Sequence, residues 1–501
     1  MIVHKIPAAL DQAFSACRSK TYSPRHERGM ALLLVLMFLC GTGRAAELHV
    51  GAATTSITPD RPIALSGQMH TRISKGVRSP VTATALALES RDGASVREQA
   101  LFVSCDLVGI DPAVIAGVRS RLKDRLPDFD PRKLIISATH THTAPVLEEG
   151  KYLIPKDGVM QPSEYMEFLC DRVTDACVTA WNGRKLGRVG WGLGHAVVAQ
   201  NRRAVYADGR SVMYGGTQEA DFRGIEGPED HGVEVLFFWD GDGKLMATAV
   251  NVACPSQEVE GDSMIDADFW HEIRESLKAA HGNDLAVLGW TGAAGDQSPH
   301  LMYRKQAEER MRKLRNVSRL EELARRVVAA WEEAYEGAKQ EPAADVPLVH
   351  RVETIALPIR LVTEAEAART RAEIATLEKD PNNARVTTWH KEVIDRYERQ
   401  KAGKVEPYAM ELHVVRLGDV AIATNDFELY TQYGIQMKAR SPALQTFVIQ
   451  LAGPGSYLPT TEAARGGGYS AIVASNLVGP EGGRALVEHT VRLINALWPA
   501  P

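Results

Sequence analysis

Short apolar runs that alternate with helical patterns constrain this 501-residue chain more than any other feature of its sequence. Residues 100–105 and 133–138 have the continuous apolar pattern of buried strands, and residues 112–126 between them have the pattern of a helix. This alternation predicts an α/β domain, because the helices cover the faces of the sheet. Residues 233–239 and 245–252 predict a hairpin across an Asp-Gly-Asp-Gly turn, so we expect mixed sheets with flanking helices.

Two strongly charged segments predict long helices in the second half of the chain. Residues 303–336 form one amphipathic pattern with a break near Asn316, and residues 363–402 predict a helical hairpin broken at the Asp-Pro-Asn-Asn sequence that starts at Asp380. The charge of the hairpin predicts a solvated insertion rather than part of the core. Further elements are expected at 411–416, 419–424 and 446–451 (strands) and at 480–497 (a final helix). The sequence contains no internal repeat or low-complexity linker, so we expect one large domain.

The N-terminal region has the pattern of a signal peptide. An apolar run at residues 31–40 is too short to span a bilayer, and small residues precede a cut after Ala45 or the next alanine. We therefore expect a leader and signal peptide at 1–46, a mature domain at 47–501, and export to the periplasm or the extracellular space. A buried first helix is the alternative, and Met30 could be the true start.

The composition excludes several classes of protein. Hydrophobic residues make up 45% of the chain and charged residues 24%, a globular balance that excludes a disordered, collagenous or coiled-coil protein. The net charge of −5 leaves no overall excess of basic residues that would attract phosphates, so we expect no nucleic-acid partner.

The cysteines do not predict a disulfide framework. Two of the six fall in the leader, and the mature chain keeps Cys105, Cys170, Cys177 and Cys254. Cys170 and Cys177 lie seven residues apart on an expected helix, which separates them by roughly 10 Å, too far for a disulfide. Cys105 ends an apolar strand and is expected in the core.

The sharpest chemical motif is SATHTHTAP, at residues 137–145, where an apolar strand runs directly into His140-Thr141-His142. In an extended chain, residues i and i+2 point to the same side, so we expect both imidazoles to emerge together at the strand end. The strand ends of α/β folds hold their functional sites, and neutral imidazole is a common zinc ligand. Two hydrogen-bonded histidines without a metal are the alternative.

Further motifs place polar side chains after apolar segments. The segment GWTGAAGDQSPHL carries Ser298, which could be a nucleophile or an oxyanion donor, or only part of a turn before a helix. The segment NDFELYTQYG places Glu428 just past a strand end. A Gly-rich loop carries Tyr457 and Tyr469, and Arg202 follows a β segment. Each of these signals is weak when taken alone.

Taken in order, the motifs resemble the N-terminal catalytic domain of the neutral/alkaline, non-lysosomal ceramidases. The matching segments are SATHTHTAP, the Asn-Arg pair, GDQSP, the glutamate before LYTQYG and the SYLPT…GGGY loop; VGAATTSITPD and SCDLVG also resemble the start of that domain. The resemblance covers roughly residues 48–499. It implies a zinc-dependent amidase that cleaves an N-acyl bond with metal-activated water, and a small-molecule or lipid amide substrate, as in sphingolipid metabolism.

The same resemblance implies roles for single residues. It implies three zinc ligands, His140, Glu428 and Tyr457. It also implies four catalytic residues, His142, Arg202, Ser298 and Tyr469. Of these, Arg202 and Tyr469 would contact the substrate carbonyl or the tetrahedral intermediate, and Ser298 matches the serine of the family's GDxSP motif. We expect the three ligands to lie within about 8 Å of one another, because zinc ligands sit about 2 Å from the metal.

One departure affects the metal site. The family has a second zinc histidine in a segment like NFAxHG, whereas residues 251–259 read NVACPSQEV and place Pro255 at that position. Proline cannot bind a metal. His231, then the adjacent Cys254, then His271 are the candidates to replace the missing ligand, since thiolate and imidazole both bind zinc. A lost or weakened metal site is the alternative.

A second departure affects the substrate. The family's β-sandwich domain, which follows the catalytic domain, is expected to be absent because the sequence stops at Pro501, which puts ceramide itself in doubt. An ester, lactone or phosphoester hydrolase is the first alternative, with Asp106, Asp266, Asp268 and Asp296 as carboxylates for phosphoester chemistry. A non-catalytic binding protein with a degenerate metal site is the second. The sequence leaves oligomeric state, metal identity and peripheral membrane contact open.

Overall fold

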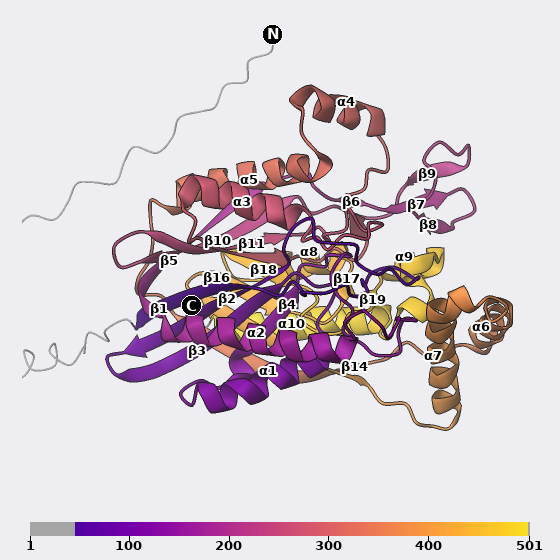
Figure 1. Cartoon of the computed structure of the whole chain (residues 1–501), viewed down its shortest axis with the longest axis horizontal. Helices are drawn as coiled ribbons and strands as arrows, with labels where there is room; N and C mark the ends of the chain where they lie inside the picture. The colour runs from indigo at the N-terminus through magenta and orange to yellow at the C-terminus, as the bar shows by residue number, and fades with distance from the viewer. Residues whose placement is uncertain (1–45, 499–501) are drawn as a thin grey trace, which may run out of the picture. The chain divides into compact units, whose positions relative to one another are not determined.

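Two β-sheets lie face to face in residues 46–498, the part of the chain that the computed structural model describes (Figure 1). Residues 1–45 of the expected leader, with Cys17 and Cys40, lie outside the described residues. The larger sheet has eight strands in the order β12-β11-β10-β5-β1-β2-β3-β4. Their bounds are β1 (Glu47–Ser56), β2 (Thr82–Asp92), β3 (Ser95–Cys105), β4 (Leu134–Ala138), β5 (Lys185–His195), β10 (Gly232–Asp240), β11 (Leu245–Val252) and β12 (Ala286–Thr291).

The smaller sheet has four strands in the order β14-β15-β16-β18. Their bounds are β14 (Leu348–Leu357), β15 (Tyr408–Leu417), β16 (Val420–Thr424) and β18 (Gln445–Ile449). The edge pairs β3–β4, β11–β12 and β16–β18 are parallel and the other pairs antiparallel, so both sheets are mixed, as the sequence predicts. Apolar side chains from both sheets fill the space between them, with the rings of Trp290 and Phe447 6.0 Å apart.

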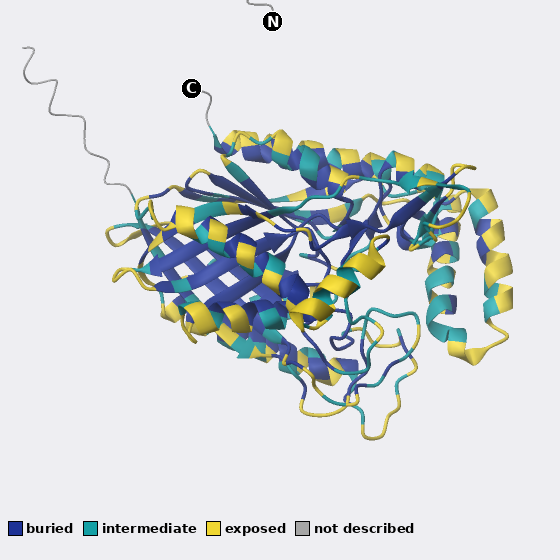
Figure 2. Ribbon diagram, turned by 90° about the horizontal axis from the view of Figure 1, so that it is seen from above, coloured by how far each residue is buried: buried dark blue, intermediate teal, exposed yellow. Residues whose placement is uncertain are grey.

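Helices cover the outer face of each sheet. On the larger sheet, α1 (Pro112–Arg125) and α2 (Pro162–Asn182) pack over β1–β4, and α3 (Phe269–His281) and α5 (Arg319–Ala338) pack over β10–β12. On the smaller sheet lie α8 (Thr431–Ala439) and α10 (Pro480–Leu497). The result is a four-layer arrangement of helices, two sheets and helices, and Figure 2 shows the strands between the helical layers in the dark blue of buried residues. The expected single α/β domain is confirmed.

The charged segments fold as helices for local reasons. Residues 303–336 divide into α4 (Lys305–Arg315) and α5 at Asn316, whose left-handed backbone (φ 54°) ends the first helix where the sequence predicts a break. Ser318 then starts α5 with a capping box, in which its hydroxyl accepts from the Glu321 N–H and the Glu321 carboxylate accepts from the Ser318 N–H.

The predicted hairpin consists of α6 (Glu364–Leu377) and α7 (Ala384–Lys401), joined through a 3₁₀ turn, η2 (Pro381–Asn383). The expectation that it is only a solvated insertion is wrong. Val393 and Tyr397 of α7 are buried, and they pack with Val362, Ala367 and Val473 in a small apolar cluster. Charge along a helix therefore predicted the solvated face of α7 and missed the buried one.

Short elements complete the chain around the strand ends. They are β6 (Gln200–Asn201), β7 (Arg203–Tyr206), β8 (Ser211–Met213), β9 (Phe222–Ile225), β13 (Gln297–Ser298), β17 (Glu428–Leu429), β19 (Tyr457–Leu458), α9 (Thr461–Gly466) and the 3₁₀ turns η1 (Pro131–Lys133), η3 (Tyr469–Ala471) and η4 (Val473–Ser475). The pairs β13–β6 and β17–β19 join segments that the sequence motifs occupy.

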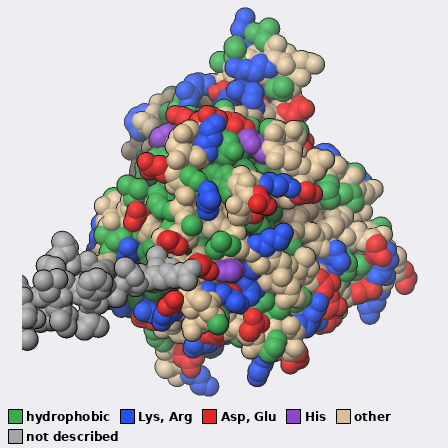
Figure 3. All heavy atoms as spheres, turned by 90° about the vertical axis from the view of Figure 1, so that its left-hand side faces the viewer, with side chains coloured by type: hydrophobic (Ala, Val, Ile, Leu, Met, Phe, Trp, Pro, Cys, Tyr) green, Lys and Arg blue, Asp and Glu red, His purple; other side chains and the backbone are tan. Residues whose placement is uncertain are grey.

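Cys105, Cys170, Cys177 and Cys254 are buried free thiols, and Cys105 is in the core as expected. Across residues 46–498, the structure contains no helix with the length and apolar character that a membrane span requires. Figure 3 shows the left-hand side of Figure 1, away from β17, β19 and α7. Positive and negative side chains are interspersed on that face, in keeping with 58 basic and 63 acidic residues in the chain.

Candidate active site

The carboxyl ends of strands from both sheets meet at one edge. The Ala138 N–H at the end of β4 donates to the Leu451 carbonyl after β18 (3.1 Å), and the Thr291 hydroxyl at the end of β12 donates to the Ala138 carbonyl (3.2 Å). The Gln450 N–H donates in turn to the Thr291 carbonyl (3.0 Å). These bonds hold the loops that follow the strands close together, at the edge where α/β folds place their sites.

His140 and His142 come together as predicted, but for a different reason. The strand β4 ends at Ala138, and His140 has a left-handed backbone (φ 68°) rather than an extended one. The turn nevertheless brings the two Nε2 atoms to 3.2 Å, with the rings nearly perpendicular at 81°. Left-handed geometry costs a non-glycine residue about 1–2 kcal/mol, and such strain concentrates at functional sites. Leu451 in the same loop cluster is also left-handed (φ 57°).

The proton on the His140 ring can be assigned from its partner. Its Nδ1 lies 2.6 Å from the Val108 carbonyl oxygen, which can only accept a hydrogen bond. A neutral ring therefore carries its hydrogen on Nδ1 and presents a lone pair at Nε2. A carbonyl that fixes the tautomer in this way is the usual partner of a metal-binding histidine.

Glu428 and Tyr457 face this lone pair because their backbones are paired. They are opposite each other in the parallel pairing of β17 and β19. Glu428 Oε2 lies 3.3 Å from His140 Nε2, and the buried Tyr457 lies opposite the same glutamate in the strand pairing. Burial would raise the pKa of Glu428, but the charge and hydrogen bond of His140 and the charge of Arg202 outweigh it and lower that pKa. Burial raises the pKa of Tyr457 well above its usual value.

The donor set of His140, Glu428 and Tyr457 fits a zinc ion. An imidazole lone pair and a carboxylate oxygen in contact both need a proton or a cation between them. Ligands bound to zinc at about 2.0–2.2 Å in a tetrahedron lie about 3.3–3.6 Å apart, which matches the 3.3 Å between His140 Nε2 and Glu428 Oε2. Within residues 46–498, no three His, Cys, Asp or Glu side chains form a group that could hold a metal ion, so the tyrosine would complete the set.

His142 is oriented by an acid that sequence reasoning missed. Its Nδ1 lies 3.3 Å from Glu260 Oε2, and Glu260 Oε1 lies 3.5 Å from His300 Nδ1. Burial, with the neighbouring His140, lowers the pKa of His142 in spite of Glu260. Gly67 is required beside this ring, because it has φ 95° and a Cβ there would lie 2.6 Å from the His142 ring. No motif in the sequence marks Glu260.

Arg202 and Ser298 lie behind His140, Glu428 and Tyr457. Arg202 Nη2 donates to the Tyr457 hydroxyl (3.1 Å) and to the Gly295 carbonyl (3.1 Å), so it contacts Tyr457 rather than the open cavity. Ser298 is fully buried, and its Oγ accepts from the Tyr214 hydroxyl (2.9 Å) and the His300 N–H (3.0 Å). Tyr214 also accepts from Gln257 Nε2 (2.8 Å). Burial would lower the pKa of Arg202, but Tyr457, Tyr214 and Glu428 raise it well above its usual value.

The Gly-Asp pair before Ser298 joins three of the motifs. Asp296 accepts from Asn201 Nδ2 (2.8 Å), from the Thr431 N–H (2.9 Å) and from the Thr431 hydroxyl (2.8 Å). Gly295 is needed because a Cβ there would lie 2.2 Å from the Glu428 carbonyl oxygen. This motif therefore fixes the position of Glu428 through backbone contacts.

The four aspartates considered for phosphoester chemistry have structural partners. Asp106 forms a two-bond pair with Arg274 (2.7 and 2.9 Å), and Asp266 accepts from the Ser79 hydroxyl (2.6 Å). Asp268 is the N-cap of α3, and burial raises its pKa to about 7. Together with the contacts of Asp296, these interactions occupy all four carboxylates.

A cavity of about 350 Å³ opens onto His140, Glu428 and Tyr457. One wall carries His140, His142, Glu428, Tyr457 and Tyr469. The opposite wall is one face of α7, with Arg385, Trp389, Glu392, Val393 and Arg396. Tyr469 lies between the walls, with its ring 5.9 Å from Tyr457 and 5.7 Å from Trp389, and burial raises its pKa to about 12.

The candidates for a replacement ligand lie elsewhere. Cys254 packs in the core beneath α3, where its thiol donates to the Val198 carbonyl (3.8 Å) and burial raises its pKa well above the usual value. His231 lies 3.1 Å from Glu229 at the start of β10. Among the described residues that line the cavity, none is His231, Cys254 or His271. The structure thus brings three of the expected ligands together and adds none of these as a fourth.

No protein-family model and no curated protein matches this sequence. Solved structures match its fold. The neutral ceramidase from Pseudomonas aeruginosa is 18% identical and superposes with a TM-score of 0.65 over 90% of this chain and 74% of its own. A ceramidase complexed with C2 is 16% identical, with a TM-score of 0.63 over 90% of this chain and 75% of its own. The resemblance that the motifs predict is confirmed at the level of the fold.

Proposed function

We propose that this chain is a zinc-dependent hydrolase that cleaves the amide bond of an N-acyl substrate. The observation that carries the proposal is the convergence of His140, Glu428 and Tyr457 beside His142 on one cavity. The fold shared with two ceramidases supports an amide as the bond that is cleaved. A fold alone does not determine chemistry, so the side chains of the cavity carry the argument.

His140, Glu428 and Tyr457 would hold the zinc ion, which when bound would polarise the substrate carbonyl and lower the pKa of a water molecule. Arg202 donates to Tyr457 and so keeps the phenolic oxygen directed at this point. The contact between Val108 and Nδ1 of His140 keeps the Nε2 lone pair directed at the same point. The protein thus orients each ligand through a partner that lies outside the cavity.

His142 is placed to move a proton. Glu260 Oε2 lies 3.3 Å from its Nδ1, and its Nε2 atom lies beside His140 Nε2, where it can take a proton from the attacking water and return it to the leaving amine. Tyr469 reaches the same cavity with a hydroxyl whose pKa of about 12 keeps it a hydrogen-bond donor at neutral pH. Such a donor to a developing oxyanion contributes about 3 kcal/mol.

The first experiment measures metal content and hydrolysis together. We expect about one zinc per chain by elemental analysis of the purified wild type, lost in His140→Ala, and hydrolysis of an N-acyl amide by the wild type only. Matched ester and lactone substrates with the same acyl group should be turned over more slowly. Hydrolysis of the ester or lactone alone would favour the other hydrolase class. An absence of zinc after zinc is supplied would favour a binding protein.

We also propose that the protein is exported, on the strength of the signal-peptide pattern at residues 31–46. Mass spectrometry of the exported fraction should find a mature N-terminus at Ala46 or Glu47. Retention of the whole leader on protein in the cytosol would contradict the proposal.

A further inference from the structure

The wall of the cavity opposite the ligands contains an arginine with unused donors. Arg385 of α7 has its Nε and Nη1 atoms buried, and neither has a hydrogen-bond partner among the described residues. The guanidinium lies 5.8 Å from the centre of the Tyr152 ring, and its charge lowers the pKa of Tyr469 against the larger effect of burial. Burying such donors without an acceptor costs free energy, so this arrangement indicates a missing acceptor.

The geometry of α7 directs this arginine into the cavity. Arg385, Trp389, Val393 and Arg396 recur at helical spacing, so they share one face of the helix. Trp389 fixes that face by its contact with Tyr469. Arg396 is already used, because it donates to the Val473 carbonyl (3.1 Å) and the Arg360 carbonyl (3.0 Å). Arg385 is therefore the guanidinium on this face whose donors stay available.

The acidic side chains of the cavity do not supply the acceptor. Glu148 pairs with Lys151, and Glu428 is engaged with His140. Glu392 is exposed, and within residues 46–498 no carboxylate lies within ion-pair distance of Arg385. An acceptor from outside the chain remains, and a planar fork of N–H donors matches a carboxylate or phosphate best.

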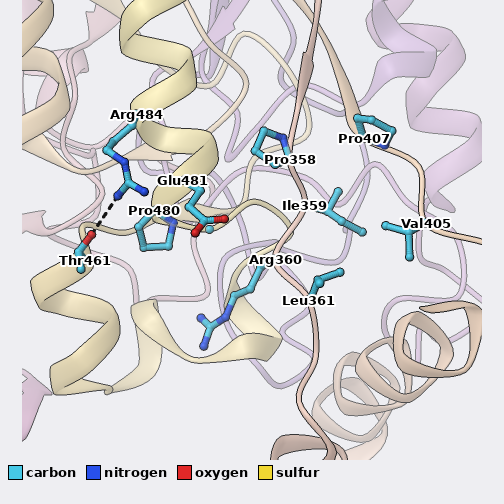
Figure 4. A pocket seen from close by; sticks show the side chains of 11 residues that line it. Pro358, Ile359, Arg360, Leu361, Val405, Pro407, Thr461, Pro480, Glu481 and Arg484 are labelled. Carbon is cyan, nitrogen blue, oxygen red and sulfur yellow. Dashed lines mark hydrogen bonds between the residues drawn. The ribbon is translucent and has the colours of Figure 1, made fainter. Parts of the chain in front are cut away.

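A second cavity contains arginines whose donors already have partners, unlike those of Arg385. It has a volume of about 650 Å³ and lies between Pro358–Leu361 and the start of α10 (Figure 4). Its arginines are occupied: Arg484 donates to the Thr461 hydroxyl (3.3 Å), and Arg360 donates to the Ala471 carbonyl (2.7 Å) and to Glu366 (3.0 Å). Both arginines of this second cavity thus have partners within the chain, whereas Arg385 has two buried donors without one.

We propose that Arg385 binds an anionic group of the substrate, so that the substrate is an acidic N-acyl amide, such as an N-acyl amino acid, rather than a neutral ceramide. The inference rests on the proposed function. Water is added across the C–N bond and gives a free fatty acid and an amino acid. The cavity of about 350 Å³ is near the lower end of the range of about 300–1,000 Å³ for small-molecule sites, which suits one small amide.

The test compares two amides that differ only in this group, N-octanoylglycine and N-octanoylethanolamine. Wild type should prefer the glycine conjugate, and Arg385→Gln should lower the ratio of kcat/KM for the two substrates by about 10- to 100-fold. Arg385→Lys should restore part of the preference. Arg399→Gln, an exposed arginine on the same helix, is the control that keeps the wild-type ratio. Equal turnover of both amides by the wild type, or an unchanged ratio in Arg385→Gln, would overturn the inference.

A binding measurement separates this inference from the proposed function. Titration calorimetry measures the affinity for N-octanoylglycine of the His140→Ala variant, and of the same variant with Arg385→Gln added. Because neither variant is expected to hydrolyse the amide, the difference reports binding at Arg385 alone. If the wild type hydrolyses no amide but binding still depends on Arg385, the proposed function fails and the anion site stands. If amides are hydrolysed and neither binding nor preference depends on Arg385, only the anion site fails.

Discussion

Two pairs of buried histidines occupy different places in this fold, and one of them lines the cavity beside Glu428 and Tyr457. His140 and His142 lie at the strand ends, with their Nε2 atoms 3.2 Å apart. His350 of β14 and His413 of β15 lie on the small sheet, and His350 contacts Gln99 in the first half of β3 and Lys133 just before β4. Nε2 of His350 lies 3.0 Å from Nδ1 of His413. Histidine pairing and burial are therefore common to both pairs and do not distinguish a functional site.

The pair on the small sheet forms a chain in which each ring nitrogen has one partner. His350 Nδ1 lies 3.2 Å from the Gln99 carbonyl, and His413 Nε2 lies 2.9 Å from Glu411 Oε1. Glu411 forms an ion pair with Arg119 of α1. The chain therefore links the small sheet to β3 and α1.

At the strand ends, several acceptors converge on one atom instead. His140 Nε2 faces both His142 Nε2 and Glu428 Oε2, and Tyr457 lies opposite Glu428 in the pairing of β17 and β19. One proton cannot serve all of these groups, whereas a cation can. The contrast teaches that convergence of acceptors, not the presence of buried histidines, distinguishes the candidate metal site.

The largest effect should come from His140→Ala. Loss of a ligand should lower kcat/KM for the amide by on the order of 10³-fold or more. The melting temperature should change little, because His140→Ala also removes one of the hydrogen-bond acceptors that crowd together around Glu428. Activity assays beside thermal unfolding would check this. Activity that survives the substitution would contradict the metal mechanism.

Glu260→Gln should have the next largest effect. A side chain that orients a catalytic histidine contributes about 10- to 100-fold, and the loss should appear in kcat with KM little changed. Glu411→Gln is the matched control, since Glu411 contacts the second histidine pair. Equal kcat losses in the two variants would show that both acids act only through stability.

His413→Ala should lower stability and leave activity unchanged, which is the reverse of the result expected for His140→Ala. The substitution leaves a cavity and removes the partner of both His350 and Glu411, so the free energy of unfolding should fall by about 2–4 kcal/mol. The folded fraction should keep its kcat, because His413 is remote from the cavity lining. Denaturant unfolding and active-site titration would check it. A kcat loss like that of His140→Ala would remove the distinction between the pairs.

The sequence predicted elements that local patterns define. Residues 480–497 form α10, and 133–138 contain β4, because apolar periodicity and continuous apolar runs reflect burial directly. It missed β14, whose residues His350, Arg351 and Glu353 interrupt the apolar pattern. That strand is specified by its pairing with β15 and by contacts of His350 with distant residues, which no local window contains.

The residues of the candidate site also fall into two groups, those that a local motif marks and those that only the fold brings together. Motifs singled out His140, Glu428 and Tyr457 because each stands in a recognisable segment, and the structure places the three side by side. Glu260 and Arg385 carry no motif, and only the fold brings them to the cavity. The left-handed turn at His140 also lies beyond local patterns, because it is stabilised by the Val108 carbonyl in the neighbouring loop.

The smallest effect that would sharpen the comparison is a pH dependence of stability. Burial lowers the pKa of His413, and with the charges of His413 and Lys133 it lowers that of His350 well below the usual value. The unfolded chain therefore binds protons near pH 6.5 that the folded chain does not. The stabilisation is complete above pH 6.5 and falls with decreasing pH, by about 1.4 kcal/mol per pH unit for each histidine.

Unfolding free energies between pH 8 and pH 5 would check this, for the wild type and for the double variant His350→Asn with His413→Asn. The wild type should lose more stability than the variant below pH 6.5. Glu411 does not enter this window, because its pKa falls to about 2, where His413 and Arg119 outweigh burial. Asp268 acts in the opposite direction, since burial raises its pKa to about 7 and its protonation stabilises the folded state, but it is common to both chains. The difference between the two chains therefore isolates the histidines, and identical pH profiles would show that this pair is not held neutral by the fold.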